Sequence, residues 1–90
     1  MSIKVKIAWH LKHLTGGKGL VETEGRNVGQ CLDNLEAQFP GIKKEISARQ
    51  KELRGLYQIF IKSTNSYTLK LDSPVKKNDE LTIQFIVSGG

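Results

Sequence analysis

This 90-residue sequence contains only one cysteine and two histidines, the residue types that most often act as nucleophiles or metal ligands. His10 and His13 stand three positions apart, so two imidazoles could supply part of a metal site. A protein-bound metal needs about three or four ligands, and the sequence offers no second cluster of Cys and His. We therefore interpret both histidines as surface residues and predict no metal site.

The single cysteine, Cys31, is a second chemical candidate, because a thiolate is a strong nucleophile. A reactive thiol needs exposure and nearby positive charge, and the residues around Cys31 indicate neither. Cys31 falls at the edge of an apolar helical stripe, where a cysteine usually packs as a small hydrophobic residue. Burial is therefore the expected role of Cys31.

A glycine-rich segment, Gly16-Gly17-Lys18-Gly19, is only faintly similar to a phosphate-binding loop. It lacks the full G-x-x-x-x-G-K-[ST] spacing and follows no junction between a strand and a helix. No Ser-His-Asp or Cys-His arrangement can be placed, and no pair of carboxylates shares a pocket. The sequence therefore predicts no catalytic residue, no bound cofactor and a protein that is not itself an enzyme.

The remaining candidate is the ending, Ser88-Gly89-Gly90, which presents a terminal carboxylate on an unhindered chain. Average glycine usage is about 7%, so two glycines at these positions are rarely a coincidence. No periodic pattern follows Val87, and we expect residues 88–90 to form a loose tail.

Hydrophobic periodicity predicts the elements that position this tail. Alternation of apolar and polar residues indicates strands with one buried face at residues 3–9, 20–24, 57–62 and 81–87, with a short extended piece at 67–71. Val28, Leu32, Leu35 and Phe39 recur at helical spacing after the N-cap Asn27. Pro40-Gly41 ends this helix, a short turn is expected around Ile42 and Ile46, and residues 47–55 are predicted to be an exposed loop or a frayed helix.

One amphipathic helix has one apolar stripe, and a sheet of four or five strands has one face to place against it. The order of strands around the helix is that of the β-grasp (ubiquitin-like) fold, an α+β fold with a mixed sheet packed on one main helix. We expect residues 1–87 to form this single domain and residues 88–90 the tail.

Composition limits the partners and the compartment. The net charge is +5, but the basic residues are scattered along the chain, whereas nucleic-acid binding needs a concentrated basic footprint. No apolar run approaches the roughly 18 residues of a membrane span, and no signal peptide is recognisable. A lone cysteine fits a reducing compartment, so we expect a cytoplasmic protein that binds neither membranes nor nucleic acid.

Several segments together resemble the ubiquitin-like sulfur carriers, a family that includes the small subunit of molybdopterin synthase, the thiamine-pathway carrier and the carrier paired with a cysteine synthase. The matching residues run along nearly the whole chain: Thr15-Gly16-Gly17-Lys18, residues 21–25, residues 27–29, residues 32–42, Ile59-Phe60-Ile61, residues 78–83 and Val87-Ser88-Gly89-Gly90. The Thr-Gly-Gly-Lys turn and the Pro-Gly-Ile after the helix are most similar to the cysteine-synthase-associated branch.

The resemblance implies that the carboxylate of Gly90 is adenylated by a ubiquitin-activating-type enzyme, which consumes ATP. The acyl group would then become a thiocarboxylate that donates sulfur to an accepting synthase in cofactor or amino-acid biosynthesis. Gly89 and Ser88 would form the tail that enters the enzyme. The family docks through an exposed sheet face, and by position that face would include Ala8, Phe60, Thr68, Gln84 and Ile86.

Two other functions remain open from the residues. A ubiquitin-like modifier joined to lysines through Gly90 would share activation by adenylation, and a nucleic-acid-binding module would use the +5 charge. This chain also departs from the family, because Phe85-Ile86-Val87 stands where the family often has proline, and Asn78 replaces a turn glycine. The receiving pathway and the identity of the activating enzyme therefore stay undetermined at this stage.

Overall fold

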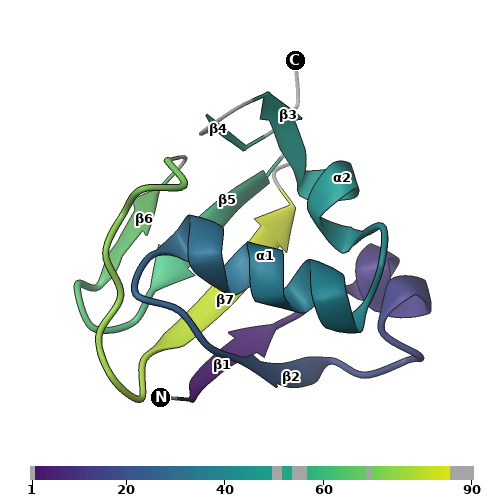
Figure 1. Cartoon of the computed structure of the whole chain (residues 1–90), viewed down its shortest axis with the longest axis horizontal. Coiled ribbons are helices and arrows are strands. Elements are labelled where there is room, and N and C mark those ends of the chain that lie inside the picture. The colour runs from purple at the N-terminus through teal and green to yellow at the C-terminus, as the bar shows by residue number, and fades with distance from the viewer. Residues whose placement is uncertain (1, 50–51, 54–56, 69, 86–90) are drawn as a thin grey trace.

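The computed structural model describes residues 2–49, 52–53, 57–68 and 70–85 (Figure 1). The elements are, in chain order, β1 (Ile3–Lys6), the 3₁₀ helix η1 (Trp9–Leu14), β2 (Leu20–Thr23), α1 (Val28–Gln38), α2 (Ile42–Ile46), β3 (Ser47–Arg49), β4 (Glu52–Leu53), β5 (Tyr57–Ile61), β6 (Ser66–Thr68) and β7 (Glu80–Phe85). None of the helices in the described ranges is long and apolar enough to cross a membrane. The predicted tail, residues 88–90, lies outside the described residues.

Five of the strands form one mixed sheet in the order β2-β1-β7-β5-β6. The outer pairs β1–β2 and β5–β6 are antiparallel, β5 is antiparallel to β7, and β1 is parallel to β7. The last strand of the sequence is therefore the central strand of the sheet. This arrangement confirms the predicted β-grasp architecture.

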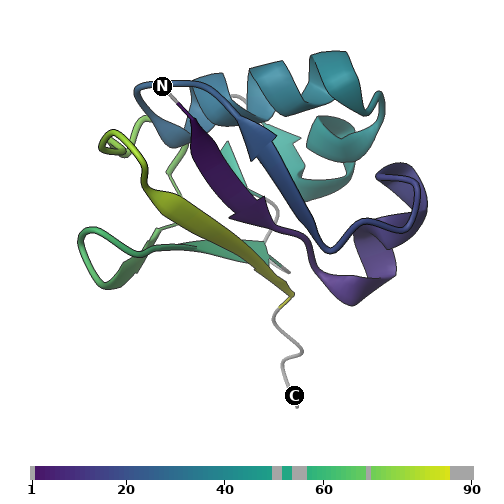
Figure 2. The ribbon, with the colours of Figure 1, turned by 90° about the horizontal axis from the view of Figure 1, so that it is seen from below.

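The core lies between one face of the main sheet and the helices α1 and α2, which Figure 2 shows on the same side of that sheet. Alternate residues of its strands are buried on this side, as for Ile3 and Val5 of β1, which are fully buried. Leu32 and Leu35 of α1 are fully buried in the same cluster. Burying a large aliphatic side chain contributes about 1.5–3 kcal/mol, so this alternation sets the register of the sheet.

The main helix begins where the sequence predicts. The side chain of Asn27 accepts a hydrogen bond from the backbone N–H of Gln30 at 2.8 Å, which satisfies a donor in the first turn. At the other end, the carboxylate of Glu36 accepts from the N–H groups of Gly41 (2.7 Å) and Lys43 (2.9 Å). Glu36 therefore fixes the start of α2, which buries Ile42 and Ile46 as the expected short turn would.

The predicted first strand, residues 3–9, is wrong at its end. Alternation places Trp9 on the buried face with Ile3, Val5 and Ile7, but in the structure Trp9 is 79% exposed. The chain leaves the sheet after Lys6 and turns into η1 at Trp9. Because the turn changes the period, Leu11 takes the buried position instead.

Residues 47–55, predicted as a loop or frayed helix, instead contain the two short strands β3 and β4. They pair antiparallel in a separate two-stranded sheet with an irregular register. Strand pairing uses backbone donors and acceptors that polar residues also carry, so the polar composition does not prevent it.

The turn before β7 is organised by a buried carboxylate. Asp79 is 5% exposed, and its side chain accepts four hydrogen bonds, from the N–H and hydroxyl of Ser63 (3.0 and 2.6 Å) and from the N–H groups of Lys76 (3.1 Å) and Glu80 (2.9 Å). Its backbone carbonyl also accepts from the N–H of Lys4 at 3.1 Å. One residue thus joins the chain segments next to β1, β5 and β7.

These contacts make stability depend on pH. Burial raises the pKa of Asp79, but the hydrogen bonds to the carboxylate outweigh it, so the pKa lies below its ordinary value of 3.8. A lowered pKa in the folded state stabilises the fold above pH 3.8, and this stabilisation is lost as the pH falls through the folded-state pKa.

We expect Asp79→Asn to lower the free energy of unfolding by about 1–3 kcal/mol at pH 7, because an amide cannot accept all four hydrogen bonds. The loss should shrink at low pH, where the native carboxyl is also neutral. Urea unfolding of both proteins at pH 7 and at a pH below the folded-state pKa of Asp79 measures the difference. The exposed Asp72→Asn is the matched control, and an equal loss in both variants would contradict this role of Asp79.

Candidate functional site

The central strand leads directly to the predicted tail. β7 is held by parallel pairing to β1 and by antiparallel pairing to β5, and it ends at Phe85, five residues before Gly90. A strand paired on both sides has a fixed direction, so it can direct the following chain toward a defined end of the sheet. Ile86, Ser88, Gly89 and Gly90 lie outside the described residues, and their roles stay predictions.

The sheet face opposite the helices carries a row of side chains that crosses all five strands. The registers align one residue from each strand: Leu20 of β2, Lys6 of β1, Thr82 of β7, Phe60 of β5 and Tyr67 of β6. Leu20 and Tyr67 are 50% and 52% exposed. The rings of Phe60 and Tyr67 meet edge to face with centroids 5.0 Å apart. We call these five residues the exposed row.

A charged row runs beside the exposed row. Lys4 of β1 pairs with Glu22 of β2 on one side and with Glu80 of β7 on the other. Glu80 also lies 3.4 Å from the ammonium of Lys6, measured from carboxylate oxygen to nitrogen. Exposed ion pairs contribute about 0–1 kcal/mol, so their main effect here is a pattern of alternating charge. A partner that docks on the exposed row would meet this pattern at one border.

The residues predicted for the interface do not all lie on this face. Gln84 is exposed and pairs with Gln58, and Phe60 lies in the exposed row. Ala8 instead packs against the core. Thr68 pairs with the buried Ile59, so strand alternation places it on the helix-facing side.

The hydroxyl of Thr68 accepts a hydrogen bond from the N–H of Lys70 at 3.0 Å and lies 2.5 Å from the hydroxyl of Ser73. Its place beside Phe60 in the exposed row is taken by Tyr67, which the sequence prediction missed together with Leu20 and Thr82. Only the register between β5 and β6 could have identified Tyr67, because neighbouring residues in a strand point to opposite faces.

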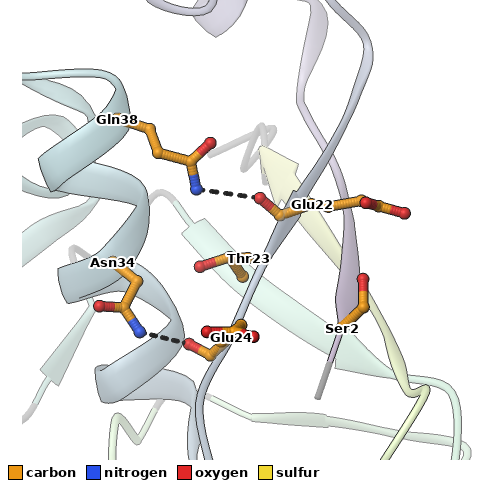
Figure 3. A pocket seen from close by; sticks show the side chains of 6 residues that line it. All are labelled: Ser2, Glu22, Thr23, Glu24, Asn34 and Gln38. Carbon is orange, nitrogen blue, oxygen red and sulfur yellow. Dashed lines mark hydrogen bonds between the residues drawn. The ribbon is translucent and has the colours of Figure 1, made fainter.

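A hollow lies between β2 and α1 (Figure 3). Two α1 side chains point across it, and Asn34 donates to the carbonyl of Glu24 at 2.6 Å while Gln38 donates to that of Glu22 at 3.0 Å. β2 is an edge strand, and these amides occupy carbonyls that an added strand would otherwise use. We interpret the hollow as protection of the sheet edge and not as a ligand site.

The side chains considered first for chemistry are not arranged for it. Cys31 is fully buried, and burial raises the pKa of its thiol, with a further contribution from the negative charge of Asp79, to about 11. The thiol is therefore neutral at physiological pH. Over the described residues, no group of three or more His, Cys, Asp and Glu could hold a metal ion.

No protein-family model and no curated protein sequence matches the chain. Solved structures do match it. The Amycolatopsis orientalis BexX/CysO complex contains a chain with a TM-score of 0.85 and 28% identity, covering 98% of this chain and 99% of that one. Mycobacterium tuberculosis CysO matches with a TM-score of 0.81 and 24% identity over 94% of this chain and 99% of that one. Small archaeal modifier protein 1 from Methanosarcina acetivorans matches with a TM-score of 0.75 and 26% identity over 99% and 96%.

The structural neighbours are ubiquitin-like sulfur carriers of the CysO, small archaeal modifier, Urm1 and molybdopterin-converting-factor types, which matches the family that the sequence resembles. They are small carrier proteins or subunits, and they support a general role of this chain as a ubiquitin-like sulfur carrier. The structure with BexX shows that one such carrier binds a partner protein.

The burial of Cys31 has a measurable consequence. We expect the native protein to resist alkylation by iodoacetamide at pH 8, because the thiol is inaccessible and its pKa is about 11. In denaturing urea the same thiol should react quickly. Mass spectrometry after timed quenching measures the reaction, with free cysteine as the control for reagent activity. Equal rates in native and unfolded protein would contradict the burial of this thiol.

Proposed function

We propose that the chain is a sulfur carrier whose Gly90 carboxylate is adenylated by a partner enzyme and converted into a thiocarboxylate. The observation that supports this most strongly is the Gly89-Gly90 ending, which follows the central strand of a β-grasp sheet within five residues. The buried, neutral Cys31 supports the same assignment, because it removes the one thiol of the sequence as a sulfur attachment point.

The chemistry explains why activation is needed. A carboxylate is a poor electrophile, because substitution would have to expel oxide. When the Gly90 carboxylate attacks the α-phosphorus of ATP, pyrophosphate leaves and an acyl-adenylate forms. Sulfide then attacks the acyl carbon, the C–O bond breaks, and AMP leaves with the electron pair. The product is a thiocarboxylate, in which one oxygen of the carboxylate has been replaced by sulfur.

Glycine suits both final positions for a steric reason. The tail must enter a narrow cleft of the partner so that the terminal carboxylate reaches the α-phosphate. A residue without Cβ allows close approach and accepts a wide range of backbone angles. The carrier provides the reacting atom, while the adenylating enzyme binds ATP and provides catalysis.

Recognition of the body would use the sheet face opposite the helices. Phe60 and Gln84 lie on this face, and Leu20 and Tyr67 extend its apolar area. Large aromatic side chains are frequent binding hot spots, which favours Phe60 and Tyr67 as anchors. We propose that the adenylating enzyme and a sulfur-accepting synthase bind this face in turn, in the cytoplasm.

A ubiquitin-like modifier is the second candidate. It is favoured by one specific observation, the likeness to small archaeal modifier protein 1. In that case the amine of a lysine on a target protein would attack the acyl carbon of the Gly90 adenylate, AMP would leave, and an isopeptide bond would form. An epitope-tagged chain purified under denaturing conditions separates the two functions, because covalent adducts on other proteins support the modifier. The two functions can also coexist.

Loading of Gly90 is the direct test. Incubation with the adenylating enzyme, ATP and sulfide should raise the intact mass by the difference between one sulfur and one oxygen atom. Deletion of Gly90 should abolish the gain without changing the melting temperature, whereas Cys31→Ala should be loaded like the native chain. An unchanged mass with an enzyme that loads its own known carrier would refute the proposal, and so would loss of the gain in Cys31→Ala.

A further inference from the structure

The most exposed large apolar side chain of the described residues lies outside the exposed row. Trp9 is 79% exposed at the first position of η1, while Leu11 of the same helix is 1% exposed in the core. Tryptophan offers a large contact area at a low cost in conformational entropy, and it is enriched at binding hot spots. Its exposure on an ordered helix is therefore a reason to look for a binding role.

The backbone beneath Trp9 is held firmly. Leu11 fixes η1 to the core, and the hydroxyl of the buried Thr15 donates to the carbonyl of Lys18 at 2.7 Å. The N–H of Gly17 donates to the carbonyl of Lys12 at 2.8 Å. Gly17 has φ of 87°, a conformation that glycine adopts without strain, so the turn after η1 can close tightly. A side chain presented on such a platform loses little freedom when a partner binds.

Trp9 also lies at the end of the sheet where β7 finishes. β1 and β7 are parallel, with Lys4 opposite Glu80 and Lys6 opposite Thr82, so both strands end at the same side of the molecule. η1 begins just after β1, and Figure 2 shows it at the end of the sheet where β7 finishes. An enzyme that receives Gly90 must approach this end.

The charge around Trp9 specifies the chemistry of the partner. Of the four lysines in the first 21 residues, Lys4 and Lys6 lie beside Glu22 and Glu80 in the sheet, whereas Lys12 and Lys18 lie on η1 and in the turn after it. Residues three apart on a 3₁₀ helix are aligned, so Lys12 follows Trp9 on one side of η1. Lys12, His13 and Lys18 are all exposed. We call Trp9 with these three residues the Trp9 surface.

We propose that the Trp9 surface is a second contact for the adenylating enzyme, separate from the exposed row. The enzyme would offer an apolar pocket for the indole, bordered by Asp and Glu side chains that face Lys12 and Lys18. This inference rests on the proposed function, and it adds a surface and a charge pattern that the tail and the exposed row do not specify. Contact through both surfaces would align the tail with the cleft before Gly90 enters it.

The chain provides its own probe, because Trp9 is its single tryptophan. The chain is titrated with the adenylating enzyme that loads Gly90 while tryptophan fluorescence is recorded. An enzyme whose own tryptophans are replaced by phenylalanine leaves Trp9 as the source of the signal. The emission of Trp9 should shift to shorter wavelength as the indole leaves water. In the loading assay, Trp9→Ala should raise the KM for the carrier about tenfold or more, the effect of losing a hot-spot side chain, with kcat nearly unchanged. Trp9→Phe should recover part of the KM.

Charge reversal tests the acidic border. Lys12→Glu with Lys18→Glu should raise KM and reduce its dependence on salt, because the attractive pairs are replaced by repulsive ones. Lys77→Glu is the control at the exposed turn before β7, at the opposite end of that strand, and should leave KM unchanged. Melting temperatures of all variants show whether a change in KM reflects binding or misfolding.

The outcomes separate this inference from the function on which it rests. If the native chain is loaded and Trp9→Ala is loaded with an unchanged KM, the Trp9 surface is not a contact and only this inference fails. If the native chain is not loaded, the proposed function and this inference both fail. Quenching of Trp9 by a single-stranded RNA oligonucleotide, without a shift on adding enzyme, would assign the surface to nucleic acid and overturn the inference.

Discussion

The four hydrogen bonds to the carboxylate of Asp79 are the constraint on which the arrangement of the sheet depends. They fix the turn from which β7 starts, and they attach it to Ser63, just beyond the end of β5. The carbonyl of the same residue accepts from Lys4 of β1. β7 is the last strand of the main sheet along the chain, and it must pair in register with both β1 and β5. The buried carboxylate of Asp79 aligns the first residue of β7 with both partners.

Because β7 is the central strand and is followed by the Gly89-Gly90 ending, the proposed reacting group lies outside the residues that build the core. The core, the helix caps and the capped edge at β2 all concern the stability and solubility of the body. The amides of Asn34 and Gln38 close one edge of the sheet against an added strand, so a partner is directed toward the open face and the far edge. Under the proposed function, the reacting group then belongs to the residues that follow β7 and not to a side chain of the body.

Local sequence patterns were enough to predict most of the fold. Alternation identified the strands of the main sheet, and Asn27 with Pro40 delimited the main helix, because these signals act within a few residues. The position of Trp9 and the pairing of β3 with β4 were missed, since a change of period and a backbone-only pairing leave no apolar pattern. The same limit applied to the site, where Thr68 was predicted in place of Tyr67. In the short strand β6, Thr68 pairs with Ile59 and Tyr67 pairs with Phe60, and this pairing decides which of the two lies on the exposed face.

The burial of Cys31 has a consequence for the cargo under the proposed function. An external oxidant such as dissolved oxygen can take two electrons from a thiocarboxylate and a neighbouring thiol, which joins them as an acyl disulfide that can no longer donate its sulfur as a nucleophile. Cys31 is fully buried with a pKa of about 11, so the carrier keeps its own thiol both inaccessible and protonated. A loaded chain can therefore travel between enzymes without consuming its sulfur on itself.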